Sequence, residues 1–341
     1  MRSWGAMFDP DAPATGDGIY GLPHSPQEAR VVLIPVPWDA TTSYRAGAAR
    51  GPSAIRKASA QVDLFDLETG CPYEAGIALL EESPEVMAWN SEARAAAEPI
   101  IATGGRVEGK LAHCLDRVNQ LGAQLNQWVR SETERWLDQG KLVGIIGGDH
   151  SVPYGAIQAL AERHPGLGIL HFDAHADLRE AYEGFIWSHA SIMYNVISRI
   201  PSLSRLVQVG IRDLGRAEMD LIQSSNGRIV THFDAPLKAR QFEGESWALQ
   251  CRQIVADLPR DVYISFDIDG LDPTLCPHTG TPVPGGLTFS QATFLISALA
   301  KSGRKIVGFD LNEVAPGPEG DEWDANVAAR LIYKMVGFAI R

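Results

Sequence analysis

Three short apolar runs of the sequence lead directly into acidic and histidine residues. KLVGIIGG precedes the pair Asp149-His150, LGILHF precedes the segment from Asp173 to Asp177, and DVYISF precedes Asp267 and Asp269. Apolar runs of this length that are bounded by turn residues are typical of buried strands. In an open parallel sheet the carboxyl ends of the strands share one edge, where a crevice forms. The three segments are therefore predicted to meet at one place.

The rest of the chain alternates between strand-like and helix-like patterns, which is typical of an α/β fold with a parallel sheet covered by helices on both faces. The predicted strands are residues 31–36, 141–148, 167–175, 205–211, 261–269 and 305–314. One predicted helix starts at Gly51-Pro52. The other predicted helices span residues 111–139, 151–164, 189–200 and 326–340. We expect one domain over residues 29–341, after an irregular N-terminal arm over residues 1–28.

The composition limits the classes of partner. The 341 residues carry a net charge of -12, whereas nucleic acids and anionic membranes select basic surfaces. The N-terminus lacks the apolar stretch of a secretory signal, and no apolar run reaches the length of a membrane span. The four cysteines are far apart and form no C-x-x-C pair. We therefore expect reduced thiols and a cytoplasmic protein.

Gathering these acids in one crevice requires a cation. Four carboxylates at close range repel one another, and some of them would otherwise have to stay protonated. Carboxylates combined with two imidazoles suit divalent Mn, Ni, Co or Fe better than a thiolate zinc site does. Two ions about 3.5–4 Å apart could use the two imidazoles and four of these carboxylates. Each pattern alone could be a turn or a helix cap, but three of them at three strand ends favour a metal centre.

The second segment places Asp173, His175 and Asp177 at every other position. Side chains at i, i+2 and i+4 of an extended chain face the same way. The spacing therefore predicts that these three side chains point at one pair of ions.

These segments resemble the signature motifs of the ureohydrolases, the arginase and agmatinase family. The matching stretches are GGDHS (147–151), FDAHADLR (172–179) and SFDIDGLDP (265–273), with further similar stretches at 37–56, 279–287 and 312–316. The resemblance extends from about residue 30 to the C-terminus. It implies a three-layer α/β/α fold with a mostly parallel sheet of about eight strands, and a homo-oligomer that is a trimer or a hexamer.

The resemblance also implies a role for each site residue. The ligands of two divalent ions, Ni²⁺ or Mn²⁺, would be His150, Asp173, His175, Asp177, Asp267 and Asp269, with Asp173 and Asp267 bridging the ions. Such ions lower the pKa of water, which would attack the central carbon of a guanidinium group. Asp177 would also orient that water, His189 would carry protons to the leaving amine, and Glu313 would hold the guanidinium.

The segment REAYEGFIWSH (179–189) differs from arginases, which place polar side chains there to receive the amino acid. We interpret Trp187 and His278 as residues that make the pocket compact, and Arg179 either as a carboxylate receptor or as a cation paired within the protein. Residues 62–101 resemble those of guanidine hydrolases, which implies hydrolysis of guanidine to urea and ammonia.

Other functions remain open at this point. The substrate could be an N-alkylated guanidine, a biguanide such as metformin, agmatine or guanidinobutyrate. From other classes, the chain could be a non-catalytic subunit in a mixed oligomer with a paralogue, or a single-zinc deacylase of a related fold. Both of those classes have fewer metal ligands than the six present here.

Overall fold

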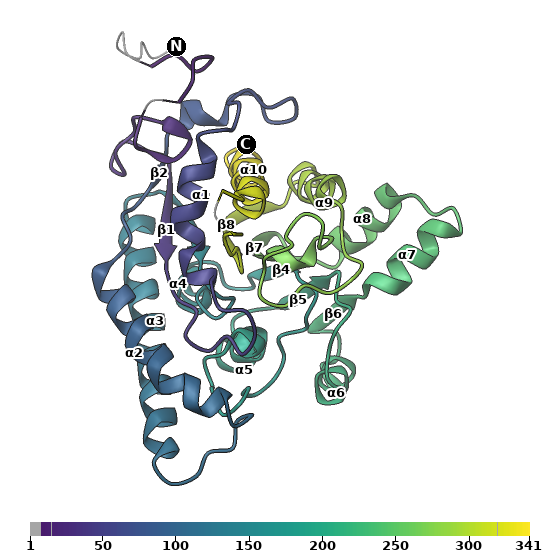
Figure 1. Ribbon diagram of the computed structural model, residues 1–341. Coiled ribbons are helices and arrows are strands. Elements are labelled where there is room, and N and C mark those ends of the chain that lie inside the picture. Colours follow the sequence, from purple (N-terminus) through teal and green to yellow (C-terminus); the bar gives the residue numbers. More distant parts are fainter. Residues whose placement is uncertain (1–7, 15, 319) are drawn as a thin grey trace.

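A single eight-stranded sheet organises the computed structural model, which describes residues 8–14, 16–318 and 320–341 (Figure 1). All paired strands are parallel, in the order β2-β1-β3-β8-β7-β4-β5-β6. The strands are β1 (Val31–Val36), β2 (Ile77–Leu79), β3 (Leu142–Gly147), β4 (Gly168–Phe172), β5 (Arg205–Val209), β6 (Ile229–His232), β7 (Asp261–Asp267) and β8 (Lys305–Asn312).

Alternate strand residues enter two apolar cores on opposite faces of the sheet. In β1, Val31 and Leu33 pack into one core, and Val32 and Ile34 pack into the other. The first core is covered by α1 (Gly51–Ser59), α8 (Trp247–Ala256), α9 (Phe289–Lys301) and α10 (Trp323–Ala339). The opposite face is covered by α3 (Leu111–Leu137), α4 (Tyr154–Arg163) and α5 (Ile192–Arg199). The period of two along the strands thus produces the three-layer α/β/α arrangement.

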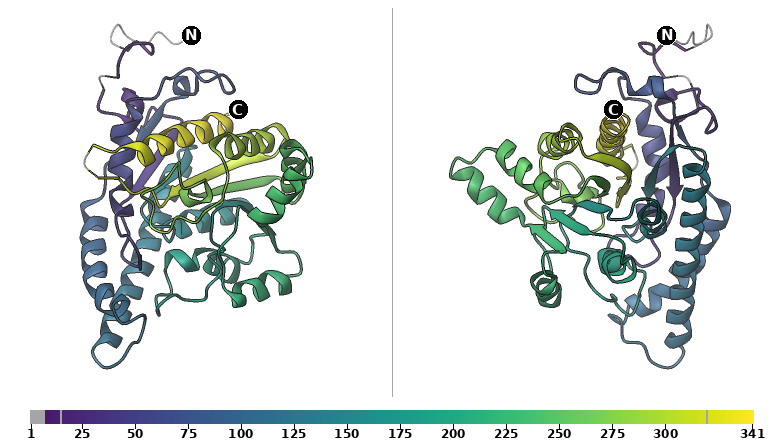
Figure 2. Two further views of the ribbon diagram at one scale, coloured as in Figure 1. Left: turned by 45° about the vertical axis from the view of Figure 1, so that its right-hand side comes forward. Right: turned by 180° about the vertical axis from the view of Figure 1, so that it is seen from behind.

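The remaining helices lie outside these layers or at their edge. α2 (Pro84–Ile101) packs along the outer side of α3, and the two form a long pair at one side of the molecule (Figure 2). α6 (Arg216–Ser224) and α7 (Asp234–Phe242) flank the edge strand β6. The described residues also form five short 3₁₀ helices: η1 (Ile19–Gly21), η2 (Ala48–Arg50), η3 (Pro72–Ala75), η4 (His189–Ser191) and η5 (Ile268–Gly270).

The sheet order brings the motif-bearing strands together. β3, β7 and β4 occupy the centre of the sheet, with β8 between β3 and β7. Their carboxyl ends therefore lie side by side, although β3 and β8 are separated by more than 150 residues of chain in the sequence. The crevice predicted at this edge is formed by four adjacent strands.

The predicted strands and helices are confirmed, with differences at their ends. β4 stops at Phe172, so that the predicted strand 167–175 extends three residues too far at its carboxyl end. The sequence patterns did not reveal β6 or the helices α6 to α9. β6 and α6 to α8 are at most ten residues long, whereas α9 has 13 residues and a buried side that sequence reasoning overlooked. Within residues 71–105, which showed no clear pattern, the structure has η3, β2 and α2.

Part of the predicted N-terminal arm packs on this chain. Residues 1–7 and 15 lie outside the described residues. Tyr20 is buried between α1 and α10: its backbone N–H donates to Oγ of Ser59 at 2.8 Å, and its hydroxyl donates to the carbonyl oxygen of Ala329 at 2.9 Å. The division into an arm and a domain stays a prediction, but η1 contributes to the same core as the sheet.

Across the described part of the chain, no helix has both the length and the apolarity that crossing a bilayer requires. The longest helix, α3, carries charged and polar side chains along its exposed side.

Replacing Tyr20 with alanine tests the packing of the N-terminal segment. We expect Tyr20→Ala to lower the free energy of unfolding by about 3–5 kcal/mol, since a fully buried aromatic ring leaves a cavity when it is removed. Chemical denaturation followed by circular dichroism measures the change. Phe242→Ala is the control, because this ring is 87% exposed and should change stability by less than about 0.5 kcal/mol. Equal, small effects of both changes would contradict the packing.

Candidate metal centre and active site

The structure brings together all six residues that were predicted as metal ligands. Two groups of His and Asp side chains have ligand atoms within 4.8 Å of one another. The first group is His150, His171, Asp173 and Asp177, and the second is Asp173, His175 and Asp269. Asp267 lies beside the first group, with Oδ2 3.5 Å from Nδ1 of His150.

His150 follows a pair of glycines at the end of β3. A Cβ on Gly148 would lie 1.8 Å from the carbonyl oxygen of Trp38, so only glycine lets the chain pass there. The turn buries His150 and places its Nδ1 3.0 Å from Oδ2 of Asp173 and 3.2 Å from Oδ2 of Asp177.

The other ring nitrogen of His150 is held by the protein. Nε2 lies 2.9 Å from the hydroxyl of Ser265, which donates to Oδ1 of Asp310 at 3.1 Å. Because the hydroxyl gives its proton to Asp310, it accepts from Nε2–H of His150. Nδ1 is therefore the nitrogen that can present a lone pair to a metal ion.

Asp173 is fully buried and lies between the two groups. Its Oδ2 faces His150, while its Oδ1 lies 3.4 Å from Nδ1 of His175. Nδ1 of His175 also lies 3.1 Å from Oδ2 of Asp269. A carboxylate with one oxygen toward each histidine is suited to bridge two ions.

The chain between Asp173 and Asp177 does not follow the predicted extended path. β4 has already ended, and Asp177 has a positive φ of 54°. Its carbonyl oxygen accepts from the backbone N–H groups of Met193 and Tyr194 at 3.0 and 3.1 Å, which fixes this turn against the start of α5. The side chains reach one centre because the chain turns, and strand alternation was the wrong reason for their convergence.

Asp267 and Asp269 lie where β7 passes into η5. Oδ1 of Asp267 accepts from the backbone N–H of Asp269 at 2.8 Å, and Oδ1 of Asp269 accepts from that of Ala174 at 3.0 Å. Arg212 donates to the carbonyl oxygens of Asp269 and Val283 at 2.7 and 2.9 Å. These bonds tie the loop after β7 to the loops after β4 and β5, and thereby fix the separation of the two groups.

The buried acids have strongly altered pKa values. Burial raises the pKa of Asp177 to about 7, and the neighbouring Asp173 adds to the rise. Burial also raises the pKa of Asp267 well above its ordinary range. For Asp173, burial alone would raise the pKa, but hydrogen bonds from His150 and His171 outweigh it and hold the pKa well below that range. Acids at such short range cannot all ionise without added positive charge.

A pair of divalent cations fits this donor set. The Nδ1 atoms of two histidines and the oxygens of four aspartates face one another at 3.0–3.5 Å. The donors are oxygens and imidazole nitrogens, as Mn²⁺- or Ni²⁺-type ions prefer. The two groups share Asp173, so the arrangement fits a binuclear site.

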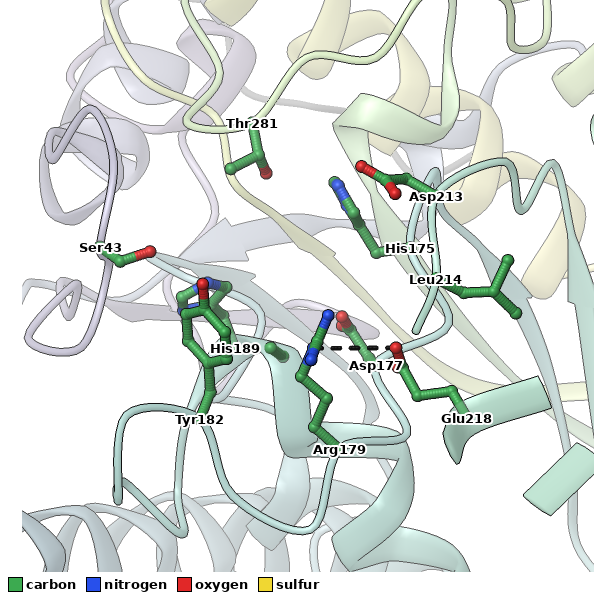
Figure 3. A pocket seen from close by; sticks show the side chains of 11 residues that line it. Ser43, His175, Asp177, Arg179, Tyr182, His189, Asp213, Leu214, Glu218 and Thr281 are labelled. Atoms are coloured by element: carbon green, nitrogen blue, oxygen red, sulfur yellow. Dashed lines mark ion pairs between the residues drawn. The ribbon is translucent and has the colours of Figure 1, made fainter. Parts of the chain in front are cut away.

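A cavity of about 200 Å³ borders both groups, because one ligand candidate from each, Asp177 and His175, lines it (Figure 3). His175, Asp177 and His189 line it together with residues of several loops, which include Ser43, Arg179, Tyr182, Asp213, Glu218 and Thr281. A substrate in this cavity would therefore lie directly against the candidate metal ligands.

Arg179 reaches into the cavity from its rim, but its charge is already paired. Its Nε lies 3.7 Å from Oε2 of Glu218, as the dashed line in Figure 3 marks. Its guanidinium lies 5.2 Å from the ring centre of Tyr182. Of the two roles that the sequence left open, the geometry favours the cation paired within the protein.

His189 lines the cavity at the start of η4. Ser188 caps this turn by accepting from the backbone N–H of Ala190 at 3.3 Å. Burial, together with the charges of His175 and His150, lowers the pKa of His189 to about 4. Its imidazole is therefore neutral at pH 7, and can accept a proton during a reaction.

Glu313 lies beside the centre, directly after β8. Its Oε1 accepts from the backbone N–H of His150 at 2.9 Å. A Cβ on Gly280 would lie 3.7 Å from its Oε2, so this oxygen lies under the loop that also carries the cavity residue Thr281. Glu313 has a positive φ of 62°. Strained backbone of this kind in a non-glycine residue is concentrated at functional sites.

Trp187 and His278 lie away from the cavity, contrary to their predicted place in the pocket. The ring of Trp187 packs 4.9 Å from that of Tyr154 and lies under the guanidinium of Arg199 at 5.0 Å. Nδ1 of His278 lies 2.8 Å from Oδ2 of Asp324. Packing on α4 and α5 holds the first side chain, and a hydrogen bond with Asp324 of α10 holds the second.

Sequence reasoning missed His171 and Asp213. His171 lies two positions before Asp173 on β4, so the strand alternation that was applied to later positions would have placed it on the same face. Asp213 lies in the loop after β5, which pairs with β4, and it lines the cavity. A fourth apolar run that leads into an acid, RLVQVGIRD, was the available signal.

Comparison with known proteins gives a consistent result. The model of the arginase family matches residues 29–337. The chain is 35% identical to the N(1)-aminopropylagmatine ureohydrolase of Thermus thermophilus over 94% of each chain. It is 30% identical to the agmatinase of Cronobacter sakazakii over 98% of this chain and 97% of that protein. The crystal structure of the agmatine ureohydrolase of Thermoplasma volcanium superposes with a TM-score of 0.73 at 24% identity, covering 96% of this chain and 95% of that chain.

The altered pKa values predict how the stability of the metal-free chain depends on pH. Burial raises the pKa of both Asp149 and Asp177 to about 7, from 3.8 in the unfolded chain. Their contribution to stability is complete below pH 3.8 and is lost as the pH rises through 7. His189 has the opposite sign, but with a folded pKa of about 4 its contribution is complete above pH 6.5. Stability should therefore fall between pH 6 and 8.

Thermal unfolding in the presence of a chelator measures this trend. We expect the unfolding midpoint to fall by at least about 3 °C from pH 6 to pH 8. Added Mn²⁺ should raise the midpoint more at pH 8 than at pH 6, because ligands must lose their protons to bind a metal. The control Asp177→Asn, with a side chain that does not titrate, should show a shallower fall. A midpoint that stays level or rises with pH in the chelator would contradict the assigned pKa values.

Proposed function

The chain belongs to the arginase family and is an agmatinase-like ureohydrolase of a guanidino compound, and we propose that its substrate carries a cationic tail, as agmatine does. The products would be urea and the amine of the tail. The observation that carries this proposal is the charge at the rim of the cavity, where one acid has no partner.

The unpartnered acid is Asp213. Its side chain is exposed, it lines the cavity, and within the described residues its carboxylate makes no hydrogen bond or ion pair. The neighbouring Arg179 is offset by Glu218. The rim therefore carries a net negative charge, which attracts an ammonium group and repels a carboxylate. Relatives that are named for agmatine and aminopropylagmatine, both cationic, support the same class of substrate.

Each cavity residue has a task in this proposal. Two divalent ions held by the six ligands would lower the pKa of water and stabilise negative charge as water adds to the guanidinium carbon. Asp177 orients that water, and Glu313 holds the guanidinium by charge-assisted hydrogen bonds. His189 accepts a proton and passes it to the leaving amine. The carbon–nitrogen bond to the tail then breaks and leaves urea.

Guanidine itself is the second candidate, and the size of the cavity favours it. A volume of about 200 Å³ is below the usual 300–1,000 Å³ of ligand pockets. A substrate without a tail would fill the inner part of the cavity and would make no contact with Asp213. N-alkylated guanidines and biguanides are larger variants of this candidate. A guanidino acid such as guanidinobutyrate is less favoured, because Arg179 is already paired.

We also propose Mn²⁺ or Ni²⁺ as the native ions, since both suit the donor set. A trimer or hexamer stays a proposal as well, with or without a paralogous subunit. The presence of all six ligands in one centre argues against a purely non-catalytic subunit.

Urea release from a substrate panel tests the proposed function. The protein would be reconstituted separately with Mn²⁺ and with Ni²⁺. The panel would contain agmatine, N(1)-aminopropylagmatine, guanidine, methylguanidine, metformin, guanidinobutyrate and arginine. We expect a substrate with a cationic tail to have the highest kcat/KM. A kcat/KM for guanidine at least tenfold above that for agmatine would instead establish the second candidate.

Substitution of the ligands tests their assigned roles. We expect His175→Ala and Asp177→Ala each to lower kcat by at least about 100-fold, because each removes a donor from the centre. The fold should be retained, as circular dichroism would show. His164→Ala is the matched control, because this histidine pairs with Asp261 far from the centre and should leave kcat unchanged. Wild-type turnover by either ligand variant at full metal loading would refute the roles.

Asp213→Asn tests the binding of the tail. We expect KM for agmatine to rise about threefold to tenfold, which is the strength of a partly exposed ion pair with an ammonium group. KM for guanidine should stay unchanged because guanidine has no tail. Asp220→Asn is the matched control, since Asp220 pairs with Arg216 on α6 and does not line the cavity. An equal rise in KM for both substrates would count against the proposed contact.

A further inference from the structure

A chain of hydrogen bonds runs from the half-buried Thr231 on the edge strand β6 through two buried side chains to the candidate metal centre. The hydroxyl of Thr231 donates to Oε1 of Gln208 at 2.9 Å, and Nε2 of Gln208 lies 3.0 Å from Nδ1 of His171. Nε2 of His171 lies 2.8 Å from Oδ2 of Asp173. We propose that His171 is not a metal ligand but a positioning residue, which Gln208 holds in the tautomer that donates to Asp173.

The orientation of Gln208 is determined by its other contacts. Its Nε2 donates to the carbonyl oxygen of Ala176 at 2.8 Å, and its Oε1 accepts from Thr231. Turning the amide over would place Oε1 against that carbonyl oxygen, which repels it. Gln208 is fully buried, so water cannot compensate for the lost bonds. The amide nitrogen therefore faces His171.

This orientation decides which nitrogen of His171 carries the proton. An amide nitrogen can only donate, so Nδ1 of His171 uses its lone pair to accept from Gln208. The proton of the neutral ring is then on Nε2, which donates to Oδ2 of Asp173. Both ring nitrogens are occupied by protein partners, and no lone pair remains for an ion.

His171 differs in this respect from the two histidines assigned as ligands. His150 and His175 direct Nδ1 at carboxylate oxygens only. His150 has a separate acceptor for its Nε2–H in Ser265. His171 lies within the first group of potential ligand atoms, but its hydrogen bonds give it another task.

That task is to orient the shared carboxylate. Asp173 faces His150 with Oδ2 and His175 with Oδ1. A donor at 2.8 Å occupies one lone pair of Oδ2 and fixes the plane of the carboxylate, so that the remaining lone pairs would be free to bind the two ions. Supporting hydrogen bonds of this kind commonly change metal affinity by 10- to 100-fold. The inference rests on the proposed metal centre but does not depend on which guanidino compound is the substrate.

Metal binding by variants of the full-length protein tests this inference. Mn²⁺ affinity and stoichiometry would be measured by isothermal titration calorimetry, and the absorption spectrum of the Co²⁺-substituted protein would report the ligand set. His171→Leu removes the donor, while His171→Gln keeps an amide donor near the position of Nε2. Gln208→Met and Thr231→Val break the chain farther out. His164→Leu is the matched control, because His164 also contacts an aspartate oxygen at 2.8 Å but lies at the opposite edge of the sheet.

The positioning role predicts a graded result with two ions per chain throughout. We expect His171→Leu to weaken Mn²⁺ binding 10- to 100-fold and Gln208→Met to weaken it about threefold to tenfold. His171→Gln should recover most of the loss, and the kcat of the fully loaded variants should fall while KM stays near the wild-type value. Unfolding midpoints identify any variant that fails to fold. If His171→Leu does not fold, the Mn²⁺ affinity of Gln208→Met, which leaves His171 in place, tests the inference instead.

Two outcomes would overturn the inference alone. If His171→Leu and His171→Gln each bind one ion fewer and change the Co²⁺ spectrum alike, His171 is a ligand. If Gln208→Met and His171→Leu bind Mn²⁺ as the wild type does, the chain of bonds is only structural. A wild-type protein that binds no divalent ion would overturn the metal centre itself, and this inference with it.

Discussion

The mutual repulsion of buried carboxylates is the constraint on which the rest of the site depends. Asp173, Asp177, Asp267 and Asp269 are all buried within a few ångströms of two histidines. The metal-free chain can hold them together only by keeping protons that free carboxylates would lose at neutral pH, as the pKa of about 7 for Asp177 shows. Divalent cations would remove that conflict, because positive charge favours the ionised form of every acid in the centre. The metal-free protein is therefore less stable than it would be without these acids, but its metal site is already formed before an ion binds.

The architecture supplies the rigidity that this repulsion demands. Four central strands end at the same edge, and the backbone and side-chain hydrogen bonds that Arg212 donates join the loops after β4, β5 and β7. Behind the acids, Ser265 and Gln208 fix the tautomers of His150 and His171. A buried polar network of this kind fixes the orientation of its side chains only when each member has a hydrogen-bond partner. The positions of the ligands are thus set by the sheet, and their orientations are set by the side chains beneath them.

In the proposed function, substrate selectivity would come from a different part of the structure. The inner cavity is formed by the metal-facing side chains, whereas its rim is built from the loops that carry Ser43, Tyr182, Asp213 and Thr281. Because the rim comes from loops, it can change between relatives while the centre stays the same. The pairing of Arg179 with Glu218 leaves Asp213 as the rim charge available to a substrate, and this links the local electrostatics to the proposed preference for a cationic tail.

The sequence by itself determined the fold class and the strands that carry the motifs, because both depend on local patterns: apolar periodicity and the residues that directly follow each strand. Its resemblance to the ureohydrolases selected the six candidate ligands from the seven acidic and histidine side chains at those strand ends. Only the tertiary structure decided that β8 lies between β3 and β7, that Asp177 reaches the centre through a turn, and that Trp187 and His278 point away from the cavity. Asp213 and Gln208 likewise gained their roles from strands that are neighbours in the sheet but distant along the chain. The physical reason is that strand order and side-chain partners depend on packing between segments far apart in the sequence, which a local pattern does not record.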